Sequence, residues 1–134
     1  MHWSSKSDYG LQVLKVLVRQ WAIRPDDYLH VNELAVELGI SRKYVEHLLL
    51  PLAWGELIET KRGQHGGCRL RRPPNRVSLA EAFEALEGRS LPGLSEISQQ
   101  TGYAPQLTKV IERISDTTRH ILEAETLEVL ADPV

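Results

Sequence analysis

The fold is decided by residues 29–70, which read LHVNELAVELGISRKYVEHLLLPLAWGELIETKRGQHGGCRL. The apolar spacing predicts a helix, a tight turn and a second helix, and the glycine-rich segment after them predicts a β-hairpin. A winged helix-turn-helix has these elements in this order, so we expect a fold that is mainly α with a small β-wing. Helix-turn-helix domains place their second helix in the major groove, which makes double-stranded DNA the expected partner.

The first helix of the pair is expected over Val31–Leu38. Its apolar face has helical spacing and consists of Val31, Leu34, Ala35 and Leu38. Gly39 follows, and because glycine adopts positive φ without steric cost, it predicts a sharp end to the helix. Ile40 is then expected to be buried in the turn.

The second helix is expected to begin after Ser41, a good N-cap residue. Its expected buried face is Val45, Leu48, Leu49 and Leu52. Its exposed first turns carry polar side chains, namely Arg42, Lys43, Tyr44, Glu46 and His47. Because a recognition helix meets base edges through its N-terminal part, we expect these residues and Ser41 to bind DNA. Pro51 removes a backbone donor and is expected to kink or end the helix between residues 47 and 50.

Hydrogen-bonding chemistry indicates a role for each of these side chains. Arg42 or Lys43 would donate to guanine, and Glu46 would accept from N4 of cytosine. Tyr44 or His47 would reach a phosphate or a base. A helix–glycine–helix segment alone fits a short αα-hairpin inside a helix bundle equally well, so the next segment decides between the two interpretations.

That next segment is a polar loop, Gly63–Gly67, flanked by the stretches Leu57–Arg62 and Cys68–Arg72. It predicts a β-wing. Between Thr60 and Ala80 there are six cationic side chains and no acidic one: Lys61, Arg62, Arg69, Arg71, Arg72 and Arg76. A charge run is commonly just a solvated face, but beside a recognition helix it lies where phosphates or a narrow minor groove would meet it.

We expect the cations of the wing to contact different parts of the DNA. Arg62, at the shoulder of the hairpin, is the expected minor-groove residue, and Arg69 and Arg71 are the expected phosphate contacts. The remaining expected wing contacts are Lys61, Gly66 and Gly67.

Four segments in the right order resemble the IscR/NsrR/CymR-type winged-helix regulators of bacteria. They are residues 5–14, residues 38–46 at the recognition helix, residues 61–67 at the wing, and residues 77–88. The similarity spans Trp3 to about Leu86 and returns in the last helix. It implies a homodimeric transcription regulator, with repression as the expected mode, in which Tyr44, Glu46 and Arg62 occupy DNA-reading positions and Arg62 enters the minor groove.

Many members of that family hold an iron–sulfur cluster with three cysteines between the winged domain and the last helix. The corresponding segment here, Glu87–Gln106, has no cysteine, and the single cysteine of the chain is Cys68. Thiolates hold such clusters, so we expect no cluster and no other cofactor. Asp8 lies where some relatives use a carboxylate ligand, although capping or stabilising the charge of the first helical turn is the simpler role.

Cys68 itself has two open interpretations. It is either a small apolar residue on the buried side of a strand or an oxidisable sensor thiol whose pKa is lowered by Lys61 and Arg69. His65 and Cys68 also form an HxxC pair, but two ligands are too few for a zinc site, which needs four.

The chain has 134 residues, of which 42% are hydrophobic, enough for one core and an appendage. We expect a winged domain over residues 1–88, a linker or regulatory loop over 89–104, and a dimerisation helix with its tail over 105–134. There is no apolar run near 18 residues and no secretory signal, which predicts a cytoplasmic protein without a membrane partner. A net charge of −2 does not oppose DNA binding, because the field at the contact surface matters more than the sum.

The first helix of the chain is expected from Lys6 or Ser7 to Trp21. Its expected buried face is Leu11, Leu14, Leu17, Val18 and Trp21. Beyond the wing, Ser78 is expected to cap a helix that ends at Leu86, and Ser78 with Glu81 fits a capping box.

The last helix is expected to run from Pro105 to about Glu125. Its apolar residues lie near heptad spacing and form the expected dimerisation seam: Leu107, Val110, Ile111, Ile114, Thr117 and Ile121. Folding back onto its own winged domain is the alternative. Either the first helix or a tail that crosses to the partner is expected to supplement the seam, the tail residues being Leu127, Val129 and Leu130. Six acidic residues from Glu112 to Asp132 place this region away from DNA.

Two other classes of function compete with gene regulation. A winged domain that holds a partner protein is one, because the fold does not fix the function. An enzyme is the other, and the sequence disfavours it because the histidines are scattered and no nucleophile, base and orienting group come together. A small-molecule or protein effector would complete a regulator, and the sequence specifies neither.

Overall fold

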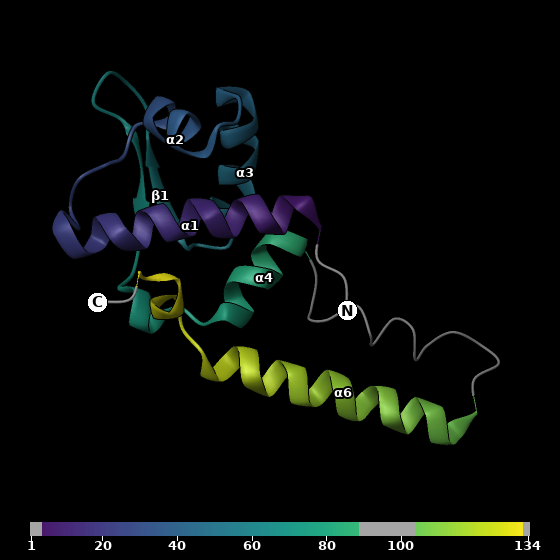
Figure 1. Cartoon of the computed structure of the whole chain (residues 1–134). Coiled ribbons are helices and arrows are strands. Elements are labelled where there is room, and N and C mark those ends of the chain that lie inside the picture. The colour runs from purple at the N-terminus through teal and green to yellow at the C-terminus, as the bar shows by residue number, and fades with distance from the viewer. Residues whose placement is uncertain (1–3, 89–103, 133–134) are drawn as a thin grey trace.

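The computed structural model describes residues 4–88 and 104–132, and Figure 1 shows their arrangement. The helices are α1 (Ser5–Ile23), α2 (Val31–Leu38), α3 (Arg42–Trp54), α4 (Leu79–Glu87) and α6 (Pro105–Ala124). Strands β1 (Ile58–Lys61) and β2 (Gly67–Leu70) form the hairpin, and η1 (Pro74–Arg76) and η2 (Leu127–Leu130) are short 3-10 turns. The predicted fold, mainly helical with a small β-wing and a long C-terminal helix, is confirmed. The linker expected over residues 89–104 lies, except for Ala104, outside the described residues.

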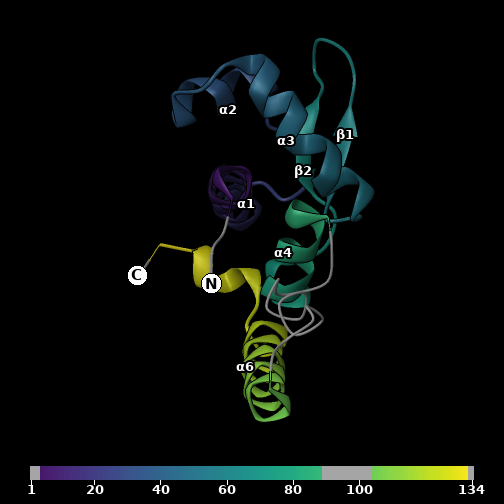
Figure 2. The same cartoon turned by 90° about the vertical axis from the view of Figure 1, so that its right-hand side faces the viewer.

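Helix α1 runs through the middle of the molecule, with α2 and α3 on one side and α4 and η2 on the other (Figure 2). Leu14, Leu17 and Val18 are buried as predicted, but Leu11 and Trp21 are only half-buried, and the helix extends beyond both predicted ends. The sequence analysis missed four buried residues of the helix: Ser7, Gly10, Val13 and Val16. The reason is that α1 is covered on two sides, so its buried surface is wider than one amphipathic stripe.

The helix-turn-helix agrees closely with the prediction. Gly39 adopts φ 67° and ends α2, and Ser41 caps α3 by accepting a hydrogen bond from the Tyr44 amide at 3.0 Å. The predicted buried face of α3 is buried in full: Val45, Leu48, Leu49 and Leu52.

Pro51 does not end the helix, because α3 continues past it to Trp54. Pro51 is itself buried, and its carbonyl accepts a hydrogen bond from the Gly55 amide at 2.9 Å. Packing of this last turn against the core offsets the single backbone hydrogen bond that proline cannot make.

The wing is an antiparallel hairpin in which Ile58 pairs with Leu70 and Lys61 pairs with Gly67. Its strands are shorter than the predicted 57–62 and 68–72. On its other side β2 is joined to the segment that precedes α2. The Leu29 amide donates to the Cys68 carbonyl at 2.8 Å, and the Cys68 amide donates back to the Leu29 carbonyl at 2.9 Å. The base of the wing is thus fixed to the helix-turn-helix.

The capping box of α4 is confirmed. The Glu81 amide donates to Ser78 Oγ at 3.1 Å, and the Ser78 amide donates to Glu81 Oε2 at 2.9 Å. Both partners satisfy backbone donors that the first helical turn would otherwise leave free.

The C-terminal tail returns to the core of its own chain (Figure 1). The Leu127 amide donates to the Val77 carbonyl at 3.0 Å, and the side chain of Leu127 is fully buried. Leu130 packs against the same core, whereas Val129 stays 53% exposed. The expectation that the tail crosses to a partner is therefore wrong for Leu127 and Leu130. None of the described helices combines the length and apolar character that a membrane span requires.

Candidate nucleic-acid interface

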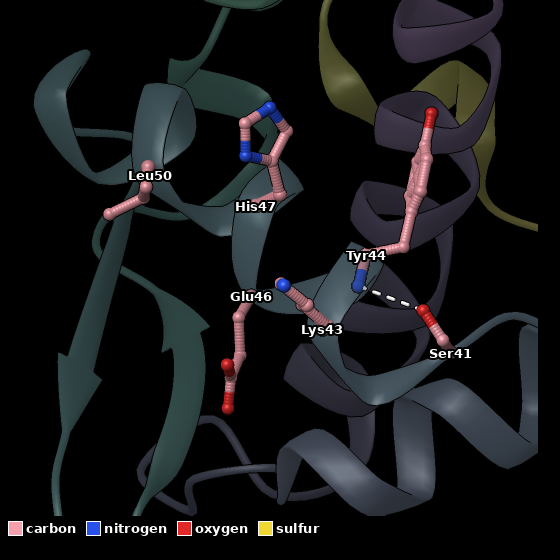
Figure 3. A pocket seen from close by; sticks show the side chains of 6 residues that line it. All are labelled: Ser41, Lys43, Tyr44, Glu46, His47 and Leu50. Carbon is pink, nitrogen blue, oxygen red and sulfur yellow. Dashed lines mark hydrogen bonds between the residues drawn. The ribbon is translucent and has the colours of Figure 1, made fainter.

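The outer side of α3 forms an open hollow of about 680 Å³ (Figure 3). The lining residues are Ser41, Lys43, Tyr44, Glu46, His47 and Leu50. The structure therefore brings together most of the residues that the sequence assigned to base reading. Because the opposite side of α3 supplies core residues, these polar side chains are presented on a helix held rigidly by packing.

Arg42, at the first turn of α3, is held between two partners. Its Nε lies 3.1 Å from Glu46 Oε1, and its Nη1 donates to Asn32 Oδ1 of α2 at 3.3 Å. Arg42 and Glu46 are both more than half exposed, so the pair adds little stability, but it orients the guanidinium. Lys43, in the same turn, pairs with no carboxylate of residues 4–88 and 104–132.

Tyr44 is the residue of the recognition helix that faces back toward α1. Its ring is half-buried and packs edge-to-face on Tyr9, with 5.6 Å between ring centroids. Such pairs stabilise helix packing. Tyr44 therefore fixes α3 on α1 as well as lining the hollow.

The cations of the wing divide into two groups. Arg62 and Arg71 are exposed and form no ion pair within residues 4–88 and 104–132, and Lys61 Nζ lies 5.6 Å from the ring centroid of Tyr28. Arg69 and Arg72, in contrast, pair with Glu59 and Glu81, each at 3.0 Å.

Arg69, which the sequence assigns to a phosphate contact, already has partners within the protein. Its guanidinium is used by Glu59 and by the carbonyl of Asp26, and its side chain is only 27% exposed. Residues 60–80 contain no acidic side chain, but Glu59 and Glu81 lie just outside this range and fold onto its arginines.

Gly66 and Gly67, which the sequence assigns to wing contacts with DNA, also have a role within the protein. Both are buried. A Cβ on Gly66 would overlap the Lys61 carbonyl, and a Cβ on Gly67, where φ is +148°, would overlap the Leu29 carbonyl. These two glycines allow the hairpin to close and to approach the segment before α2.

Cys68 is fully buried, and burial raises the pKa of its thiol to about 12. The prediction that Lys61 and Arg69 lower this pKa is wrong, because desolvation of the thiolate dominates. The thiol stays protonated at neutral pH, which favours the core interpretation of this residue over a reactive sensor. His65 is exposed on the loop, while Cys68 lies in the core.

Comparison with known proteins gives the family. A family profile described as "Iron-dependent Transcriptional regulator", named Rrf2, matches residues 3–133. The chain belongs to the Rrf2 family. The HTH-type transcriptional regulator CymR of Bacillus subtilis is 28% identical over 131 residues, which make up 98% of this chain and 90% of CymR.

Solved structures of Rrf2 relatives agree with this assignment. CymR of B. subtilis, described as the global cysteine regulator of that organism, has a TM-score of 0.79 at 26% identity over 97% of this chain and 95% of its own. The oxidized form of Staphylococcus aureus CymR has a TM-score of 0.76 at 30% identity over 100% and 98% of the two chains. IscR of T. potens, at 24% identity and a TM-score of 0.72, covers 95% of this chain and 83% of its own and supports the fold alone. The protein is therefore a winged-helix transcription regulator.

The Rrf2 description raises the question of iron, and the donor set of this chain does not fit an iron–sulfur cluster. The one cysteine is sealed in the core of the winged domain. Among the described residues no group of three His, Cys, Asp or Glu side chains lies close enough to hold a metal ion. Asp8 lies exposed in the first turn of α1, where its charge favours the helix N-terminus.

The sequence analysis missed the residues that support the interface. Asn32 orients Arg42, Tyr9 packs on Tyr44, and Tyr28 lies under Lys61 and Arg69. No periodic pattern marks them, because each is defined by a partner far away in the sequence. The high density of cations in the wing was the one sequence feature that could have indicated an aromatic partner such as Tyr28.

Proposed function

We propose that this Rrf2 regulator binds DNA sequence-specifically as a homodimer on an inverted-repeat operator and acts as a repressor. The observation that carries the proposal is the polar outer side of α3 beside a wing whose Arg62 and Arg71 are exposed. Helix-turn-helix proteins read bases with the first turns of this helix, and cations beside it meet phosphates and the minor groove.

The apolar stripe of α6 supports the homodimer. Four apolar side chains lie on its free side at spacings of seven, three and four residues and are between 42% and 58% exposed: Leu107, Val110, Ile114 and Ile121. Thr117 continues the same stripe and is exposed. The adjacent side of the helix, with Ile111 and Ser115, is buried against the chain's own fold. Ile111 is therefore not part of the free stripe. A second copy of α6 would cover the free stripe.

A two-fold dimer gives the recognition helices their geometry on DNA. Two α3 helices would enter successive major grooves about 34 Å apart and read the two halves of an inverted repeat. In each half, Arg42 or Lys43 donates to guanine, Glu46 accepts from cytosine, and Arg62 reaches the minor groove. His47 and Arg71 contact the phosphate backbone.

The assembly has a direct test in sedimentation. The substitution Ile114→Glu places a charge in the middle of the stripe and should convert the dimer to a monomer, whereas Val129→Glu, at a residue that is equally apolar and 53% exposed but lies on η2, should not. A wild-type monomer, or equal effects of the two substitutions, would contradict the proposed interface.

The regulator is proposed to work without an iron–sulfur cluster. Its anaerobically purified form should show no visible absorption, and supplying iron and sulfide should not create any. Cluster bands in either spectrum would overturn this part of the proposal.

The DNA-binding function is tested by selecting bound fragments from the native genome and measuring their affinity across a range of salt concentrations. We expect an inverted repeat and a log–log salt dependence set by the phosphates contacted. The alternative function, a winged module that holds a partner protein, predicts neither sequence selectivity nor that salt dependence. The genes next to the selected fragments would also indicate the class of effector, small molecule or protein.

A further inference from the structure

Three kinds of contact join the wing to the segment between α1 and α2. The backbone of Leu29 pairs with Cys68 through two hydrogen bonds, and Gly67 approaches the Leu29 carbonyl so closely that no side chain fits. Beside them, Arg69 of β2 donates to the Asp26 carbonyl. The wing is therefore joined to the helix-turn-helix along one side.

Tyr28 lies at the centre of this junction and faces two cations. Arg69 Cζ is 4.4 Å from its ring centroid, and Lys61 Nζ is 5.6 Å from the same centroid. Arg69 is held from its other side by Glu59 of β1, with Nε and Nη2 lying 3.1 and 3.0 Å from Glu59 Oε2. We call Tyr28, Glu59 and Arg69 the wing clamp.

The clamp is linked to Arg62 through Lys61. Lys61, the last residue of β1, pairs with Gly67 and contacts Tyr28, and Arg62 is the next residue along the chain. A hairpin of this size is marginally stable by itself, so its direction depends on what holds it. Because Arg62 directly follows β1, holding β1 and β2 against Tyr28 fixes the position of the Arg62 backbone.

We propose that the wing clamp positions Arg62 for the minor groove and so raises DNA affinity without contacting DNA. This inference rests on the proposed DNA-binding function. The clamp would act by ordering the wing before binding, since a segment that is already ordered loses less entropy when it binds. Its members are positioning residues, and their effect on affinity passes through Arg62.

A double-mutant cycle on the full chain distinguishes positioning from a general loss of stability. With the selected operator, Tyr28→Ala should weaken binding about fivefold when Arg62 is present and less than about 1.5-fold when Arg62 is already alanine, because coupled residues are not additive. Tyr28→Phe keeps the ring face and should bind like the wild type. Val129→Ala, which removes a 53% exposed apolar side chain on η2, is the control and should have no effect.

The thiol of Cys68 supplies a second readout that needs no DNA. It is fully buried at the base of the wing, so a thiol reagent reaches it only when the junction opens. Tyr28→Ala and Arg69→Ala should speed its labelling about tenfold at unchanged global unfolding, and Val129→Ala should not change it.

The outcomes separate the two proposals. If the wild type shows no selective DNA binding, the proposed function fails, while the labelling rates still test the clamp. If the wild type binds selectively but Tyr28→Ala weakens binding equally with and without Arg62, or leaves both binding and labelling unchanged, the clamp is overturned.

Discussion

The recognition helix and the wing present DNA-facing side chains in different ways. In α3, residues on one side fill the core and residues on the other side line the hollow, so the helical period separates the two roles. In the wing, neighbouring residues have opposite roles: Arg62 is exposed, whereas Gly66, Gly67 and Arg69 hold the hairpin in place. The binding side of a regular helix can therefore be identified from its sequence. In a short hairpin, the role of each residue depends on partners elsewhere in the chain.

The largest expected effect is on the shape of the wing. Gly67→Ala places a Cβ against the Leu29 carbonyl at φ +148° and should destabilise the fold by about 3 kcal/mol or more. Gly63→Ala, at φ +108° with open space around it, should cost only about 1–2 kcal/mol from backbone strain. Chemical denaturation measures both. Equal losses would mean that the close approach to Leu29 does not matter.

The next prediction concerns operator affinity and distinguishes the two exposed arginines of the wing, Arg62 and Arg71. Arg62→Ala should weaken operator binding by about 1–3 kcal/mol and relax the preference at one position, if Arg62 enters the minor groove. Arg71→Ala should weaken binding uniformly across sequences and reduce the salt slope by about one, as a phosphate contact does. Fluorescence anisotropy with single-position operator variants measures both quantities. A uniform loss for Arg62→Ala would make Arg62 another phosphate contact.

A smaller effect concerns the root of the wing, where Arg72 pairs with Glu81. Burial alone would raise the pKa of Glu81, but the hydrogen bond from the Ser78 amide and the pairing with Arg72 outweigh it and lower the pKa. Glu81→Gln should therefore lose about 1 kcal/mol at neutral pH, as expected for a damaged cap.

The pH dependence of this loss has a defined direction. A carboxyl whose pKa is lowered by folding stabilises the fold above its unfolded pKa of about 4.3, and this stability disappears as the pH falls through the folded pKa. The unfolding free energies of wild type and Glu81→Gln should thus converge in acid. Glu84→Gln, an exposed change on the same helix, is the matched control and should unfold with nearly the free energy of the wild type at neutral pH. A constant gap between wild type and Glu81→Gln would refute the charge argument.

The smallest expected effect lies on the recognition helix. Asn32→Ala removes one of the two partners of Arg42 and should weaken operator binding by about 0.5 kcal/mol, with no further loss once Arg42 is alanine. Its effect on stability should be negligible because the contact is exposed. Losses that add in the double variant would show that Asn32 acts independently of Arg42.

Much of the fold followed from local patterns. The bounds of α2, the turn at Gly39, the cap at Ser41 and the capping box of Ser78 all depend on residues within one helical turn of each other. The buried face of α3 followed from its spacing for the same reason. Local chemistry was sufficient for these elements.

The remaining features depend on contacts between distant residues. Pro51 stays inside a helix because tertiary packing supports it, and Leu127 lies in its own core because residues near it pair with residues 77–79. Arg69 is held by Glu59 and Tyr28, and its own sequence neighbours indicate neither contact. In each case the contact that determines the structure is made by a distant residue, which the local sequence does not indicate.

Hydroxyl-radical footprinting of the selected operator shows whether two copies present α3 and the wing to one duplex. We expect two protected stretches related by a two-fold axis, with centres about 34 Å apart, each flanked by minor-groove protection that Arg62→Ala removes. A single unsymmetrical footprint, or flanking protection that survives Arg62→Ala, would contradict this arrangement.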